Sequence, residues 1–199
     1  MIAVLLPPTL GEPTRLPGLA ARLAGYGITA VRPEVGGDEH PPHAARYVAR
    51  ASLEVNRLVA PDAPTALVAE GGAGPLVGAV GAAQRAAHRP VFGYVLVDAF
   101  LPQPGSPTRA DVARTQSPED AAPDTAVPPG EPAGYRTEPL PMVSDWPDAP
   151  CGYLLTDPGL RHAARLARLR GWSVREAAPE EASEALAALL VELRGGKTG

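Results

Sequence analysis

Short apolar runs alternate with segments of helical periodicity along most of this chain, and this alternation constrains the fold more than any other feature. Each apolar run has the length of a buried strand. It is followed by a segment in which apolar residues recur every three or four positions, as in a helix. This order is typical of parallel βαβ units. The expected strands span residues 2–6, 28–31, 65–68, 91–97, 152–155 and 172–174. We therefore predict an α/β protein, a three-layer α/β/α sandwich around a mostly parallel sheet of about six strands, with residues 1–199 as a single domain.

Residues 100–150 interrupt this pattern. They contain 12 of the 25 prolines and eight of the 22 acidic residues, so we expect a mostly irregular insertion. Tyr135, Met142 and Trp146 lie toward its C-terminal end. These apolar side chains predict that residues 139–150 pack against the domain, and that residues 115–134 are its most mobile part.

Charge and composition exclude several classes of function. The net charge is −4, so the chain lacks the basic surface that nucleic acid requires. No apolar stretch reaches about 18 residues, and the N-terminus lacks the pattern of a signal peptide, so we expect neither a membrane span nor export. The one cysteine, Cys151, excludes an internal disulfide and favours a cytoplasmic protein. Histidine pairs and oxygen-rich loops with metal-ligand spacing are absent, and the glycines at 71–74 match no nucleotide fingerprint, so we expect no metal and no cofactor.

Residues 67–76 carry the most specific motif, with the sequence LVAEGGAGPL. This run resembles the nucleophile elbow of small bacterial α/β-hydrolases, in which a strand, a Gly-x-Ser-Gly-small-Gly-Pro turn and an apolar helix follow in order. Residues 95–102, 151–157 and 171–174 resemble three later strands of the same family and the residues that follow them. The resemblance covers most of the chain outside residues 103–145, and it implies a version of the fold that begins at the family's third strand.

The motif departs from the family at the residues that carry the chemistry. Gly71 stands at the serine position, and the loop 175–181, where the family places its histidine, contains none. The resemblance implies that Asp157 matches the acid of the triad, and that backbone N–H groups of Gly72 and near Thr9 match the oxyanion hole. It also implies that residues 100–150 form a lid over the pocket. We expect ligand contacts from Pro8, Thr9, Leu10, Gly71, Gly72, Phe100 and Trp146.

Three carboxylates follow expected strands and are the candidate catalytic groups. Glu70, Asp98 and Asp157 would meet at the carboxyl edge of the sheet, where one of them could act as a general base with a raised pKa. Structural roles compete with this hypothesis. Asp157 precedes Pro158 and fits a helix N-cap, Asp98 could hydrogen-bond the neighbouring loop, and Glu70 could be a solvated turn residue.

Three functions remain open at this point. The first is an atypical α/β-hydrolase-like protein that binds a small or peptidic metabolite and promotes a non-hydrolytic step, such as epimerisation, isomerisation or cyclisation, in secondary metabolism. The second is a catalytically inactive pseudo-hydrolase that acts as a scaffold, as a homodimer or with a pathway partner protein. The third is a residual ester or thioester hydrolase with an unrecognised nucleophile such as Ser106, Ser144 or Cys151.

Overall fold

The computed structural model describes residues 1–117 and 130–196, so residues 118–129 of the segment expected to be mobile lie outside the described residues. The described chain forms a six-stranded, wholly parallel sheet in the order β2-β1-β3-β4-β5-β6. The strands are β1 (Ile2–Leu6), β2 (Thr29–Val31), β3 (Thr65–Glu70), β4 (Val91–Val97), β5 (Cys151–Leu155) and β6 (Ser173–Glu176). The predicted fold class is confirmed.

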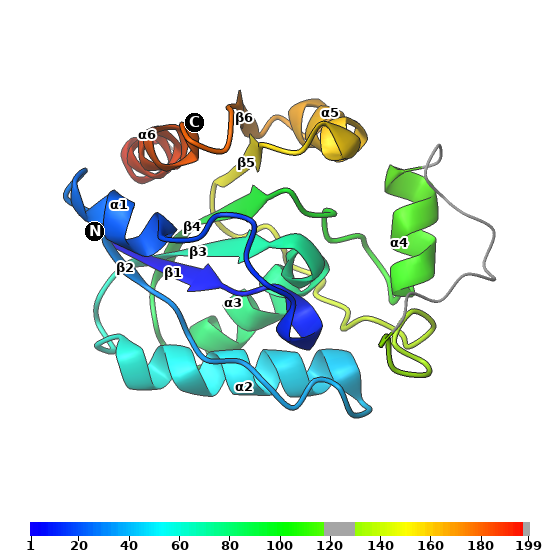
Figure 1. Ribbon diagram of the computed structural model, residues 1–199. Helices are drawn as coiled ribbons and strands as arrows, with labels where there is room; N and C mark the ends of the chain where they lie inside the picture. Colours follow the sequence, from blue (N-terminus) through cyan, green and yellow to red (C-terminus); the bar gives the residue numbers. More distant parts are fainter. Residues whose placement is uncertain (118–129, 197–199) are drawn as a thin grey trace.

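Helices cover both faces of this sheet (Figure 1). Side chains alternate along each strand, so Ala3 and Leu5 of β1 face one helix layer while Val4 and Leu6 face the other. The first layer consists of α1 (Leu19–Ala24) and α6 (Ala182–Gly195). The second consists of α2 (His43–Leu58), α3 (Val77–Ala86) and α5 (Arg161–Leu169).

Helix α3 packs unusually close to the sheet because its inner face carries glycine. A Cβ atom at Gly81 would lie 2.2 Å from the Tyr94 hydroxyl on β4, and one at Gly78 would lie 3.0 Å from the Trp146 ring. The small, apolar composition of this helix is therefore a packing requirement. It also fixes the turn that precedes the helix, η2 (Gly71–Leu76), against the end of the sheet.

The topology opens a crevice at the carboxyl edge of the sheet. After β1 the chain crosses to β2 on one side, and after β2 it returns to β3 on the other side of β1. Loops that leave β1 and β3 therefore diverge, and ligands of open α/β sheets bind at such a switch point. The short helical turns η1 (Thr9–Gly11), η2 and η3 (Pro158–Leu160) lie in the loops after β1, β3 and β5.

Both edges of the sheet are short and partly exposed. Strand β2 has three residues and β6 has four, and the last two residues of β6, Arg175 and Glu176, are exposed. Strands β3 and β5 in the interior are buried along their whole length.

The described part of the 100–150 insertion is more regular than its proline content predicts. It contains helix α4 (Arg109–Gln116), which begins with a reciprocal capping box between Thr108 and Asp111. That cap satisfies two backbone N–H groups at the start of the helix, which have no acceptor within the helix itself. The Gln116 side chain bonds both the N–H and the C=O of Leu101, at 2.7 Å each, and so ties the end of α4 to the chain after β4.

Residues 139–150 contact the domain through Leu140 and Trp146, whereas Met142, for which the sequence predicts packing as well, is exposed. Leu140 is buried, and the Trp146 ring makes edge contacts with Tyr94 and Trp172, each with ring centroids 5.6 Å apart. No described helix is both long enough and apolar enough to cross a membrane.

Candidate functional site

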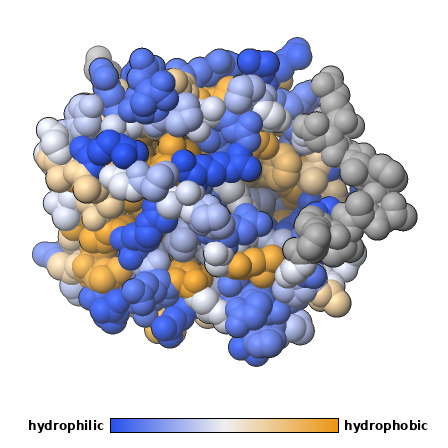
Figure 2. Space-filling model, in the orientation of Figure 1, coloured by the Kyte–Doolittle hydropathy of each residue, from blue (hydrophilic) through white to orange (hydrophobic). Residues whose placement is uncertain are grey.

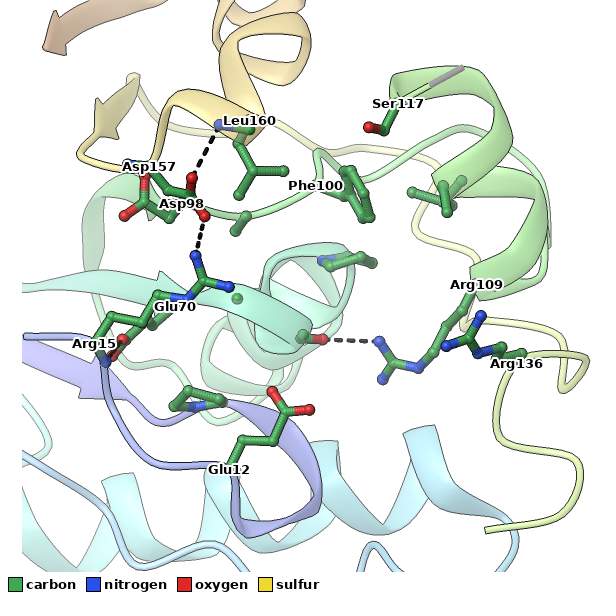
Figure 3. A pocket seen from close by; sticks show the side chains of 18 of the residues that line it. Glu12, Arg15, Glu70, Asp98, Phe100, Arg109, Ser117, Arg136, Asp157 and Leu160 are labelled. Atoms are coloured by element: carbon green, nitrogen blue, oxygen red, sulfur yellow. Dashed lines mark hydrogen bonds and ion pairs between the residues drawn. The ribbon is translucent and has the colours of Figure 1, made fainter. Parts of the chain in front are cut away.

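A cavity of about 460 Å³ lies at the carboxyl ends of β1, β3, β4 and β5. The loops after these strands form one side of it, and α4 together with residues 131–136 forms the other (Figure 3). In the orientation of Figure 1 the surface is hollowed beside α4, and apolar side chains lie in the hollow (Figure 2). This volume suits a small-molecule ligand.

Gly71 occupies the turn at the floor of the cavity. Its φ is +54°, in the left-handed region that glycine adopts without steric cost. A Cβ atom here would meet only Pro8, at 3.8 Å, so the space that a side chain would occupy is open. The elbow backbone is present, and the position supplies no nucleophile.

Asp157, the position that resembles the acid of a triad, is paired with a cation. Its Oδ2 forms an ion pair with Arg15, and its Oδ1 accepts a hydrogen bond from the Gly159 N–H at 2.9 Å. The Gly159 hydrogen bond and Arg15 together lower the pKa of Asp157. The expectation of an N-cap is confirmed, because this side chain caps η3 with Pro158 at the first helical position. A lowered pKa is the opposite of what a general base with a raised pKa needs.

Glu70 is buried, so the interpretation as a solvated turn residue is wrong. Its carboxylate accepts a hydrogen bond from the Thr14 hydroxyl at 2.6 Å and one from the Arg15 N–H at 2.5 Å. These contacts draw the loop after β1 across the end of β3. The carboxylate is thus the anchor of that loop, and burial follows from its full set of donors.

Asp98 is buried at the end of β4 with its backbone in the left-handed region, at φ +44°. Its Oδ1 accepts hydrogen bonds from the N–H groups of Thr156 at 2.7 Å and Asp157 at 2.9 Å, and its Oδ2 accepts one from the Thr156 hydroxyl. The side chain therefore bonds the neighbouring loop, as one of the two interpretations of the sequence expects.

All three candidate carboxylates line the same cavity, and Pro8, Gly71, Gly72 and Phe100 line it with them. Trp146 does not, because its indole is held between Tyr94 and Trp172, beside a separate groove. The structure therefore corrects the expectation that Trp146 contacts a ligand in this cavity.

The expected contacts of Thr9 and Leu10 also need correction. The Thr9 hydroxyl is buried against the Tyr135 hydroxyl, and the Leu10 N–H donates to Asp38 Oδ2 at 2.6 Å. Neither residue lines the cavity. The Leu10 N–H is therefore already engaged and is not available to a substrate oxygen.

The histidines, and the serines and cysteine considered as nucleophiles in the sequence, lie away from the cavity. None of the four histidines lines it: His43 is buried against Asp38, while His40, His88 and His162 are exposed. Cys151 is buried at the start of β5, where burial raises the pKa of its thiol to about 12. Ser106 is exposed and Ser144 lines the separate groove. Among the described serines, Ser117 lines the cavity, and no motif or spacing marks this residue.

Arginine and tyrosine complete the site, and sequence reasoning missed both. Arg15, Arg109 and Arg136 line the cavity, as does the Tyr135 ring. Arg109 donates to the Gly72 carbonyl at 2.8 Å, and its guanidinium carbon lies 4.4 Å from the centre of the Tyr135 ring. No local motif marks Arg15 or Arg109, because their partners Asp157 and Gly72 are far away in the chain.

The comparisons with known proteins point to one fold. The sequence matches no protein-family model and has no significant match among curated proteins. This chain superposes on an extracellular α/β-hydrolase from a Paenibacillus species with a TM-score of 0.61 at 14% identity, over 97% of this chain and 98% of that one. That hydrolase is described as sharing structural and functional homology with tobacco salicylic acid binding protein 2. An arylesterase gives a TM-score of 0.56 at 12% identity, over 97% of this chain and 75% of that one.

A thioesterase domain also shares the architecture. The Vlm2 thioesterase domain, determined with a bound dodecadepsipeptide, gives a TM-score of 0.54 at 12% identity over 95% of this chain and 91% of that one. Identities this low establish the fold alone. Together with the parallel sheet and the elbow turn, they show that this chain has an α/β-hydrolase-like fold in a trimmed form with six described strands.

Proposed function

We propose that this protein binds a small or peptidic metabolite in the cavity at the carboxyl edge of the sheet and promotes a non-hydrolytic step on it. The observation that carries the proposal is a formed cavity of about 460 Å³ built around an elbow whose apex is Gly71. Epimerisation, isomerisation and cyclisation within secondary metabolism are the reactions that fit. None of them needs an enzyme nucleophile: cyclisation depends on holding the ligand in a reactive conformation, whereas epimerisation and isomerisation also need a base that removes a proton from the ligand and an acid that returns one.

Serine-type hydrolysis lacks support at each of its three positions. Gly71 carries no hydroxyl, the loop after β6 carries no histidine, and Asp157 is paired with Arg15. A serine hydrolase needs a nucleophile, a base and an orienting acid within hydrogen-bond reach. The residual-hydrolase hypothesis therefore ranks last.

Two residues are left as candidates for proton chemistry in the cavity. Glu70 and Asp98 both line it, although both also accept hydrogen bonds from backbone N–H groups. Positioning is the larger part of the proposed function, and a carboxylate role is the smaller part. The ligand seen on the Vlm2 thioesterase domain is a depsipeptide, and we extend a peptidic ligand to this chain as part of the proposal.

The scaffold hypothesis predicts a collapsed pocket and a continuous apolar outer face. The large exposed hydrophobic side chains of the described residues come from separate parts of the chain, after α1, on α2, in the insertion, on α5 and on α6: Tyr26, Leu53, Met142, Leu169 and Val191. An apolar face for a constant protein partner is therefore not supported by these residues. We propose a cytoplasmic location, on the basis of the single cysteine.

Native mass spectrometry of the protein purified from its own producer tests the proposal. A retained small-molecule or peptide adduct above 20.5 kDa is the expected result. A chain that is bare on its own and appears only in complex with a second protein would favour the scaffold. The adduct then serves as the substrate for Glu70→Gln, Asp98→Asn and Asp157→Asn, and unchanged turnover in all three would remove the carboxylates from the mechanism. Labelling of the intact protein by a fluorophosphonate probe would instead reinstate a hydrolase.

A further inference from the structure

Arg109 differs from the other cations of the cavity in having no acidic partner. Arg15 pairs with Asp157, and Arg136 bonds Glu131 at 2.7 and 2.9 Å. No described carboxylate lies within 4.0 Å of an Arg109 nitrogen, although the guanidinium lies at the wall of the cavity (Figure 3). An arginine stays charged at neutral pH, so this charge lacks a counterion within the described residues.

The nearby acids are already engaged elsewhere. Asp38 and Glu138 act on Arg109 at longer range, but the Asp38 carboxylate accepts from the Leu10 N–H and Glu138 accepts from the N–H groups at the start of α2, at 2.7 Å each. Neither acid lines the cavity, and Glu12, which does, is exposed. Burial is also the main reason that the pKa of Arg109 is lowered. The site thus holds a cation that is costly to bury and that has no ion-pair partner among the described residues.

The Arg109 guanidinium is oriented but incompletely bonded. Nη1 donates to the Gly72 carbonyl, and the group stacks over the Tyr135 ring, which fixes its plane. Nη2 is shielded from solvent and has no hydrogen-bond acceptor among the described residues. A buried donor without an acceptor is destabilising, whereas a planar guanidinium matches the two oxygens of a carboxylate.

The cavity next to Arg109 is lined by apolar side chains as well. Phe100 lies in the chain after β4, Val112 on α4 and Leu160 in η3, and all three line the cavity with Arg109. A ligand that fills it would have an apolar body with a single acidic group at one end.

We propose that Arg109 binds the carboxylate of the ligand, so the substrate class is a small apolar acid or a peptide with a free C-terminal carboxylate. This inference rests on the proposed ligand-binding function and names its substrate class. Arg109 fixes the acidic end against the Gly72 turn, and the apolar body extends toward Asp98 and the end of β4.

A matched pair of probes tests the inference: N-acetylphenylalanine, which carries a carboxylate, and N-acetylphenylalaninamide, which replaces it with a neutral amide of the same shape. Dissociation constants for both are measured by calorimetry or ligand-observed NMR. For the native protein, the acid is expected to bind at least about tenfold more tightly than the amide, as for a hydrogen bond to a charged group. In Arg109→Gln the acid loses that advantage while affinity for the amide stays within about twofold, because the neutral probe gains nothing from the charge.

Arg136→Gln is the control, because Arg136 lines the same cavity and already bonds Glu131. It should keep the preference for the acid, and Arg109→Lys should keep part of it. If Arg109→Gln melts at a much lower temperature, the comparison of the two probes on Arg109→Lys against native protein still reports the loss of the planar contact.

The outcomes separate the two proposals. Equal affinity for acid and amide, or a preference that survives in Arg109→Gln, overturns the carboxylate site and leaves ligand binding in the cavity intact. A preference that disappears in Arg136→Gln but not in Arg109→Gln places the acid elsewhere and also overturns it. Failure of both probes to bind counts against the proposed function, and the carboxylate site falls with it.

Discussion

Substitution of Gly71 by serine tests the elbow most directly. The new residue keeps φ near +54°, and a side chain in that region costs about 1–2 kcal/mol in free energy of unfolding. Its Cβ lies 3.8 Å from Pro8, an ordinary contact, so no steric cost is added. Urea unfolding should therefore show a loss of about 1–2 kcal/mol, equivalent to a fall in Tm of roughly 2–8 °C for a chain of this size.

Gly74→Ala is the matched control on the same turn. Its Cβ would lie 2.4 Å from the Phe100 carbonyl oxygen and 2.7 Å from the Ala99 Cβ, so the backbone after β4 would have to move. We expect a loss of at least about 3 kcal/mol. Equal losses at Gly71 and Gly74 would show that the space at the elbow is not open.

The Gly71→Ser variant should remain inactive as an esterase although it restores the hydroxyl. None of the four histidines lines the cavity, and a serine protease that loses its histidine loses about 10⁶ in kcat. Hydrolysis of p-nitrophenyl acetate and labelling by a fluorophosphonate probe are the assays. Labelling of Gly71→Ser at a rate well above that of native protein would reveal a base in the cavity and refute the reasoning.

Three further predictions follow from named contacts. The folded-state pKa of Asp157 is lowered, so its contribution to stability is present above the unfolded value of about 4 and is lost as pH falls through the folded-state pKa. Asp157→Asn should lose less than about 1 kcal/mol at pH 7, and urea titrations should show that its difference from native protein shrinks as pH falls below about 4. Glu138→Ala removes the acceptor for two N–H groups at the start of α2, so it should lower the unfolding free energy by about 1 kcal/mol. An unchanged midpoint of urea unfolding would contradict that contact. The Cys151 thiol, whose pKa is raised to about 12 by burial, should fail to react with Ellman's reagent at pH 8 until urea is added, and fast reaction of native protein would show that the start of β5 opens.

The interior strands could be predicted from the sequence because each is an apolar run that is buried on both faces of the sheet. The expected run 91–97 coincides with β4, and the expected run 65–68 extends by two residues to Glu70. Helix α4 was missed because few of its side chains are apolar, so the helix depends on the Thr108 and Asp111 cap. That cap is a local signal, and a search for it could have found the helix.

The site was predictable where strand ends determine it and unpredictable where distant segments meet. Glu70, Asp98 and Asp157 lie together because parallel strands end at one edge. The partner of Asp157 is Arg15, 142 positions away, and the partner of Tyr135 is Thr9, 126 positions away. No periodicity or spacing in the sequence encodes these pairs, because they depend on how the loops are folded over the sheet.

The outer strands have a consequence for how copies of this protein meet. An uncovered strand with free N–H and C=O groups is a template for strands of other molecules, and long, flat, apolar edges are aggregation sites. Strand β2 offers three residues, and β6 ends in the exposed charges of Arg175 and Glu176, so neither edge supports a long register with another chain. Most of the apolar residues of β3, β4 and β5 are sealed between helices. Neither edge of the sheet is therefore a good template for a strand of another molecule, and we expect concentrated solutions to resist aggregation through the sheet edges.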